Sequence, residues 1–104
     1  MNYRVRFTPK GTEALRLAAL PREVIVQACN RLHNELGADP DHHLRERIVP
    51  LDLFSYRFTI SLPPKLYFCM FAVQRLDDTK ELRVVGGSFV SSFEADEDSD
   101  LSDE

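Results

Sequence analysis

The sequence predicts an α+β fold in which an N-terminal strand is followed by a helical hairpin and then by a three-stranded antiparallel meander packed on the helices. Apolar and charged side chains alternate over residues 3–7, as in a half-buried strand. Over residues 9–36 apolar side chains recur every three or four positions, which is typical of helices. Strand-like patterns return between residues 56 and 85, beginning with alternation over residues 56–61. This change of period, from two to about 3.6 and back, predicts the order of the elements.

Local signals set the ends of the helical hairpin. Thr8 is a favoured N-cap residue, and Pro9 is tolerated at the first helical position. Pro21 disfavours the helical conformation at the residue before it, so we expect the first helix to end there and a second to begin. Gly37 is predicted as the C′ residue that ends the second helix. The apolar stripe of that helix consists of Val24, Ala28, Leu32 and Leu36.

Three segments predict the meander. Residues 56–61 alternate, residues 66–73 are apolar throughout, and residues 82–85, Leu-Arg-Val-Val, follow a polar turn. For residues 45–50, a short edge strand and an irregular connection stay open.

The central strand of the meander has two apolar faces. One is formed by Leu66, Phe68, Met70 and Ala72, and the other by Tyr67, Cys69, Phe71 and Val73. We expect the helices to cover one face. The other is covered within the monomer, by the first strand and the C-terminal segment, or by a partner, because a large exposed apolar patch usually marks an interface.

The composition excludes several classes of protein. No apolar run approaches the roughly 20 residues that a membrane helix needs, and the N-terminus lacks a signal-peptide pattern, so we expect a cytoplasmic protein. Cys29 and Cys69 have no metal-binding or redox spacing and are predicted to be buried thiols. His42 and His43 are predicted to lie in a solvated loop, since adjacent side chains there point apart. We expect no metal and no cofactor.

Charge divides the chain into two parts. Seven of the 17 acidic residues lie within residues 94–104, whereas all 13 basic residues precede them, so residues 1–93 carry a net charge of +3. We therefore predict a folded domain over residues 1–93 and an acidic, disordered tail over residues 94–104.

Four segments of the chain form a recognisable series. They are residues 7–9, the Leu-Pro-x-x-Val joint at residues 20–24, the Asp-Pro pair at residues 39–40, and the strand Tyr-Arg-Phe-Thr-Ile at residues 56–60. Together they resemble the RelE/ParE toxin superfamily of type II toxin–antitoxin systems. The resemblance extends from residue 3 to about residue 93. It implies an antitoxin partner, and it implies a target that is either ribosome-bound messenger RNA or DNA gyrase.

The resemblance also assigns positions to the catalytic groups of the RelE-like ribonucleases. Arg57 matches the first basic residue of the family's strand motif and is positioned to contact a phosphate. Lys65 is placed to substitute for the arginine that the following strand normally presents. Other matched positions carry residues without the expected charge or hydroxyl, namely Thr59, Tyr67, Ser88 and Phe93. RelE-style catalysis, which needs several converging cations, is therefore disfavoured.

We therefore predict a toxin-superfamily protein that acts by binding, either ParE-like or a catalytically degenerate RelE-like protein. One alternative is an active ribosome-dependent mRNA endonuclease that uses Arg57, Lys65 and Arg83. Another is a non-toxic structural or regulatory homodimer with the same fold. The residues predicted to bind nucleic acid or a partner are Arg45, Arg47, Arg57, Lys65 and Tyr67.

Two interpretations of residues 94–104 stay open. The tail either folds back on Arg57 and neighbouring bases, or it is a solubilising terminus without specific contacts.

Overall fold

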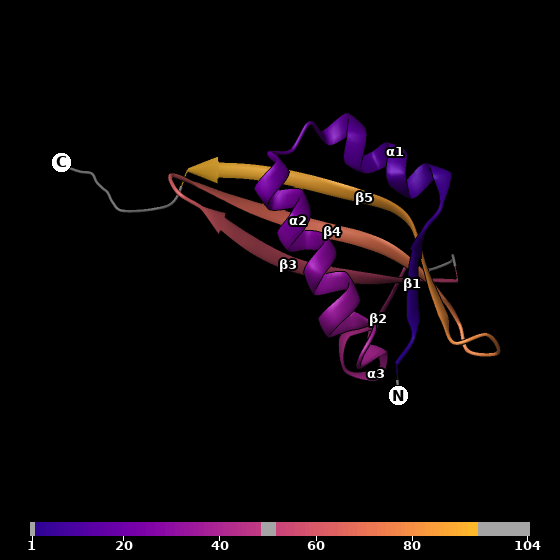
Figure 1. Cartoon of the computed structure of the whole chain (residues 1–104). Helices are drawn as coiled ribbons and strands as arrows, with labels where there is room; N and C mark the ends of the chain where they lie inside the picture. The colour runs from indigo at the N-terminus through magenta and orange to yellow at the C-terminus, as the bar shows by residue number, and fades with distance from the viewer. Residues whose placement is uncertain (1, 49–51, 94–104) are drawn as a thin grey trace.

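A five-stranded mixed sheet carries helices on one of its faces (Figure 1). The structure is a computed structural model, and it describes residues 2–48 and 52–93. In chain order its elements are β1 (Arg4–Phe7), α1 (Pro9–Ala18), α2 (Arg22–Arg31), the π-helical turn η1 (Leu32–Leu36), α3 (Pro40–His43), β2 (Glu46–Ile48), β3 (Leu53–Leu62), β4 (Lys65–Leu76) and β5 (Glu81–Phe93). The predicted tail, residues 94–104, lies outside the described residues.

The sheet has the strand order β1-β5-β4-β3-β2. Strands β3, β4 and β5 form the predicted antiparallel meander, and β2 adds an antiparallel edge strand beside β3. Within residues 45–50, for which the sequence allows a strand or an irregular connection, the structure has a strand over Glu46–Ile48. Residues 49 and 50 lie outside the described residues. β1 pairs with β5 in parallel. Since β1 extends the sheet, the expectation that it covers an apolar face is wrong.

The first helix begins where the sequence predicts. The hydroxyl of Thr8 accepts a hydrogen bond from the backbone N–H of Gly11 at 3.1 Å and donates one to the carbonyl of Val84 at 3.2 Å. This side chain therefore caps α1 and ties it to β5. The helix ends at Ala19, which adopts a left-handed conformation with φ 52°, and α2 starts directly after Pro21.

Gly37 has a different role from the predicted one. It keeps right-handed helical angles, φ −61° and ψ −33°, and its N–H donates to the carbonyl of Leu32 in a π-type turn. A Cβ atom at this position would lie 2.8 Å from the His33 oxygen and 3.0 Å from the Tyr3 oxygen. Glycine is needed here because the carbonyl oxygens of His33 and Tyr3 both lie close by, and not because the helix ends in a left-handed turn.

The core lies between the helices and one face of the sheet. The predicted helical stripe of Val24, Ala28, Leu32 and Leu36 is fully buried. It faces sheet residues that are at most 7% exposed, namely Tyr56, Ile60, Tyr67, Cys69, Phe71, Val73, Leu82 and Val84. The ring of Phe71 is central, since it contacts the rings of Phe7, Phe58 and Phe89 at centroid distances of 6.3, 5.8 and 5.3 Å. The two faces of β4 are thus distinguished: its odd-numbered residues face the helices.

Because α1 packs closely on β5 at Gly11, we expect a larger side chain at this position to destabilise the fold. A Cβ atom added there would lie 2.1 Å from the carbonyl oxygen of Val84, so backbone must move. We expect Gly11→Ala to lower the free energy of unfolding by about 1–3 kcal/mol, measured by urea denaturation. Gly86→Ala is the matched control, because nothing lies within 4 Å of its Cβ position, and its effect should stay within about 1 kcal/mol. Equal losses in both variants would contradict this packing.

Candidate functional site

The face of the sheet that points away from the helices is the open face. No helix or strand in residues 2–48 and 52–93 covers it. Its apolar side chains come from β4 and β5, where Phe68 pairs with Val90 and Met70 pairs with Ser88. Phe68 is 43% exposed and Val90 is 61% exposed. An exposed aromatic ring beside exposed aliphatic groups is the composition of a binding surface.

A shallow hollow of about 300 Å³ lies in the middle of the open face. Its main side chains come from β3, β4 and β5 and are Arg57, Thr59, Phe68, Met70, Ser88 and Val90. Apolar groups dominate its lining, and Arg57 supplies its one charged side chain. The hollow therefore offers an apolar contact next to a cation.

Arg57 is held beside this hollow by an ion pair. Its guanidinium contacts the carboxylate of Glu46 on β2, and both side chains are 61% exposed. Exposed ion pairs contribute at most about 1 kcal/mol. Another anion can therefore replace Glu46 at little cost. The sequence pattern does not predict Glu46 as the partner of Arg57, because it does not distinguish a strand from an irregular connection over residues 45–50.

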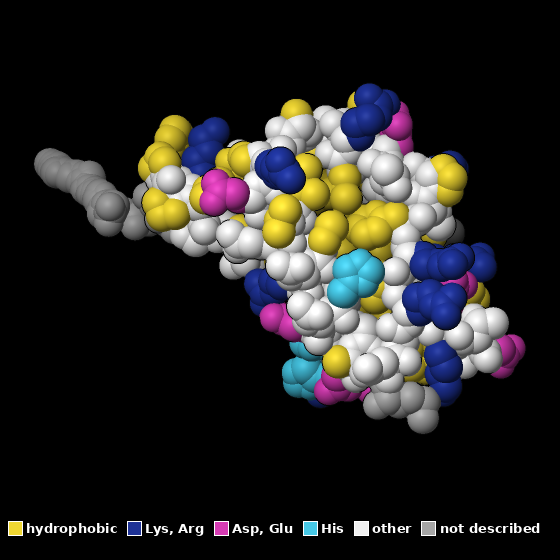
Figure 2. All heavy atoms as spheres, in the orientation of Figure 1, with side chains coloured by type: hydrophobic (Ala, Val, Ile, Leu, Met, Phe, Trp, Pro, Cys, Tyr) yellow, Lys and Arg dark blue, Asp and Glu magenta, His cyan; other side chains and the backbone are white. Residues whose placement is uncertain are grey.

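The other predicted site residues do not join Arg57. Lys65 and Tyr67 lie on the helix-covered side, in a groove of about 250 Å³ that is also lined by the connection between α1 and α2. Tyr67 is 7% exposed there. Figure 2 shows this side of the molecule, with apolar side chains between α1 and α2 and basic side chains over β1.

Both predicted arginines around β2 lie away from the hollow. Arg45 lies between α3 and β2 and is exposed. Arg47 donates to Asp52 at 2.6 Å, and its guanidinium stacks over the Phe54 ring. Arg47 alternates with Glu46 along β2, so it points to the opposite side of the sheet from Arg57.

Arg83 shares the open face with Arg57 but not its position. It lies in register with Gln74, four residues along β4 from the partner of Arg57, hence roughly 13 Å further along the sheet. Its guanidinium donates to Glu81 at 3.0 Å, and Arg6 contacts the same carboxylate at 3.4 Å. Arg57 and Arg83 are thus separate, and each has a carboxylate partner.

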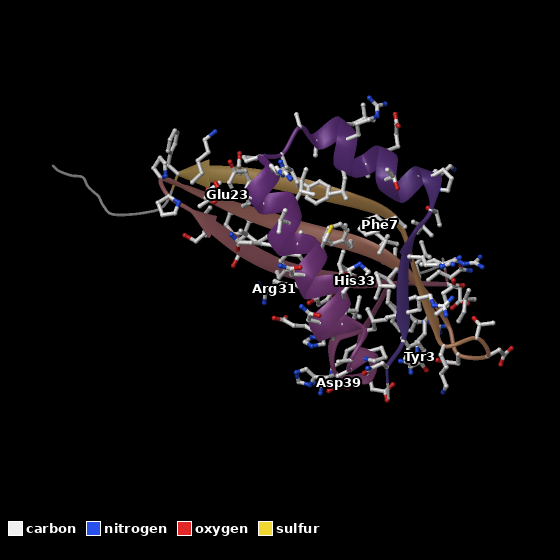
Figure 3. The ribbon with its side chains drawn as sticks, viewed as in Figure 1. Tyr3, Phe7, Glu23, Arg31, His33 and Asp39 are labelled. Atoms are coloured by element: carbon white, nitrogen blue, oxygen red, sulfur yellow. The ribbon has the colours of Figure 1, made fainter. Side chains whose placement is uncertain are left out.

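A polar cluster lies between η1 and β3. In Figure 3, Arg31 lies beside β3, where its guanidinium donates to the carbonyl of Thr59 at 3.1 Å and stacks 4.7 Å from the Phe58 ring. It also pairs with Glu35 at 3.3 Å, and the Tyr56 hydroxyl donates to the same carboxylate at 3.4 Å. Burial, and then the charge of Glu35, raise the pKa of Tyr56 to about 12.

This pKa shift predicts a loss of stability at high pH. The folded protein favours the neutral phenol of Tyr56, so that contribution to stability is complete below pH 10 and falls as the pH rises toward about 12. We expect the free energy of unfolding of the wild type to fall more steeply over that range than that of Tyr56→Phe, as followed by urea denaturation. Parallel pH profiles of the two proteins would contradict this assignment.

The thiols of Cys29 and Cys69 and the imidazole of His43 pack against other side chains. Burial raises the pKa of both the Cys29 and the Cys69 thiol, which makes them poor nucleophiles. Cys69 is buried as predicted, whereas Cys29 is half-buried. The predicted loop is wrong, because His42 and His43 both lie in α3. His42 is exposed, whereas His43 packs edge-on against the Tyr56 ring. Within the described ranges, no group of three or more His, Cys, Asp or Glu side chains is arranged to hold a metal ion.

The chain was compared with known protein families, curated proteins and solved structures. No protein-family model and no curated protein matches the chain. A chain in the crystal structure of the toxin–antitoxin complex RelBE2 from Mycobacterium tuberculosis superposes with a TM-score of 0.67 and 18% sequence identity, over 85% of this chain and 91% of that one. No helix in the described part of this chain is long and apolar enough to cross a membrane. The chain has a RelE-like α+β fold, as the sequence resemblance predicts.

Proposed function

We propose that this chain is a toxin-type protein of a type II toxin–antitoxin system that acts in the cytoplasm by binding a protein target through the open face of its sheet. One observation carries the proposal: Phe68 and Val90 are 43% and 61% exposed around a hollow in a sheet whose other face is buried. Aromatic anchors beside apolar pockets dominate the binding energy of protein interfaces.

The arrangement of cations favours binding over RNA cleavage. Catalysis of phosphodiester transfer needs several donors aimed at one phosphate, and loss of a single such donor costs roughly 10²–10³ in rate. Arg57 is turned toward Glu46 on β2, whereas Arg83 is turned toward Glu81 near the start of β5. Lys65, the third cation of the endonuclease alternative, lines the groove on the helix-covered side.

An antitoxin is the proposed regulatory partner. The solved structure that this chain resembles is a toxin–antitoxin complex. On this chain, a segment with apolar and acidic side chains would match the hollow and Arg57 together, since an apolar centre with a charged rim is the usual anatomy of an interface. An antitoxin bound there would exclude the target from the same residues.

Inducible expression of the chain in a bacterial host tests the proposed function. We expect growth arrest that is relieved when the product of a small adjacent reading frame, encoding a DNA-binding domain and a helical tail, is produced together with it. Normal growth, with a stable dimer of the purified chain in sedimentation equilibrium, would contradict the proposal and favour the non-toxic homodimer.

A further inference from the structure

The hollow of the open face has a candidate occupant within this chain. We propose that the C-terminal segment, residues 94–104, docks in cis on the open face, with Leu101 in the hollow and its acidic neighbours against Arg57. The functional consequence rests on the proposed function, because the docked segment would cover the surface assigned to the target. Three independent observations support the docking: the volume and lining of the hollow, the length of the segment, and the opposite charges of the segment and the rest of the chain.

The hollow has the room and the chemistry for one leucine side chain. Its volume is about 300 Å³, and Phe68, Met70 and Val90 are among the residues that line it. A protein cavity of about 150 Å³ is enough to hold benzene. Leu101 is the one large apolar side chain in residues 94–104. Burying it together with the exposed part of Phe68 removes apolar area from water on both sides.

The position of the strand end allows Leu101 to reach the hollow. β5 ends at Phe93, and Val90 and Ser88 in the hollow lie three and five residues before that end, hence roughly 10–17 Å back along the sheet. Leu101 lies eight positions after Phe93, and this length of chain spans up to roughly 26 Å when extended. The segment is therefore longer than the distance from the strand end to the hollow, and this extra length is sufficient for the chain to reverse direction.

Charge favours the same placement. The segment carries seven carboxylates and no basic residue, whereas the rest of the chain has a net charge of +3. Asp98 and Asp100 lie within three residues of Leu101, so they come near Arg57 when the leucine is in the hollow. Arg57 is 61% exposed, and its pairing with Glu46 is an exchangeable surface contact. Surface attraction of this kind is screened by salt over about 8 Å.

Docking would lower the apparent affinity for a target by the fraction of time that the open face is occupied. An occupancy of one half to nine tenths weakens target binding by about 2- to 10-fold. The tail would therefore act as an internal competitor that a target or an antitoxin displaces.

Amide NMR spectra of the full-length chain test the docking without any target. We expect Leu101→Ser to shift the amides of Phe68, Met70, Ser88 and Val90, and 1 M NaCl to reproduce part of these shifts in the wild type. Ala95→Ser is the matched control, because it also changes one residue of the segment but leaves Leu101 and every charge in place. Its shifts should stay within a few residues of position 95.

Each other outcome of this experiment overturns the docking proposal. Shifts confined to the neighbours of residue 101 would mean that the segment does not dock. Shifts at residues 18–21 would place it in the groove of the helix-covered side. Shifts that disappear on tenfold dilution would mean that it docks on a second copy.

A growth assay separates this proposal from the proposed function. If both hold, Leu101→Ser arrests growth at a 2- to 10-fold lower level of expression than the wild type does. Shifts on the open face together with normal growth of cells making either protein would keep the docking and overturn the proposed function. Growth arrest without those shifts would keep the proposed function and overturn the docking.

Discussion

Replacing Phe71 by alanine is expected to lower the free energy of unfolding by about 3–5 kcal/mol, the largest effect of any single truncation in this domain. The side chain is 1% exposed and meets three other aromatic rings between the helices and the sheet. Its removal forfeits the transfer energy of the ring and leaves a cavity that rigid strands cannot close. Since small domains are stable by about 5–15 kcal/mol, urea denaturation should show an early transition or none.

Phe93→Ala is the control for this prediction. Phe93 is also an aromatic residue of the sheet, but it is 73% exposed and contacts Lys65 at the end of β5. Its truncation should change the free energy of unfolding by no more than about 0.5 kcal/mol. Similar losses in the two variants would show that the ring of Phe71 does not lie at the centre of the core.

The double variant Phe68→Ser/Val90→Ser is expected to abolish growth arrest while the fold stays intact. The two side chains pair across β4 and β5 on the open face and are largely accessible to water. Removing interface anchors of this kind typically costs about 2 kcal/mol or more of binding free energy each. The free energy of unfolding should fall by no more than about 1 kcal/mol, since little buried surface is lost.

Leu17→Ser/Val26→Ser is the matched control for the open face. These residues are apolar, 69% and 47% exposed, and lie on α1 and α2, on the other side of the sheet. Cells that make this variant should arrest as the wild type does. If the helix variant lost toxicity and the open-face variant kept it, the target would bind on the helices.

Periodicity and local capping chemistry predicted most of the fold. The four-residue recurrence from Val24 to Leu36 needs only helical geometry to place these side chains on one buried face. Thr8 before Pro9 predicts a helix start without knowledge of the rest of the chain. Gly37 shows the limit of such signals, because its small size is required partly by the distant chain of Tyr3, as well as by the His33 carbonyl of its own turn.

The candidate site was less predictable, since it depends on which face of the sheet the helices cover. Alternation separated Phe68 and Met70 from Phe71, but only the packing of the helices decides which set stays exposed. Lys65 was grouped with Arg57 through a family motif. In the structure it shares the helix-covered side with Tyr67, two residues along the same strand. The carboxylate that holds Arg57 comes from β2, a strand of three residues whose pattern is too short to recognise.

Sequencing the 5′ ends of messenger RNA from growth-arrested cells tests most directly whether the chain acts by binding. Cells expressing the wild type and cells expressing Arg57→Ala should both lack new codon-linked 5′ ends, because Arg57 and Arg83 do not converge on one phosphate. Codon-linked ends that appear with the wild type and vanish with Arg57→Ala would contradict this account and assign the chain a messenger-RNA endonuclease activity.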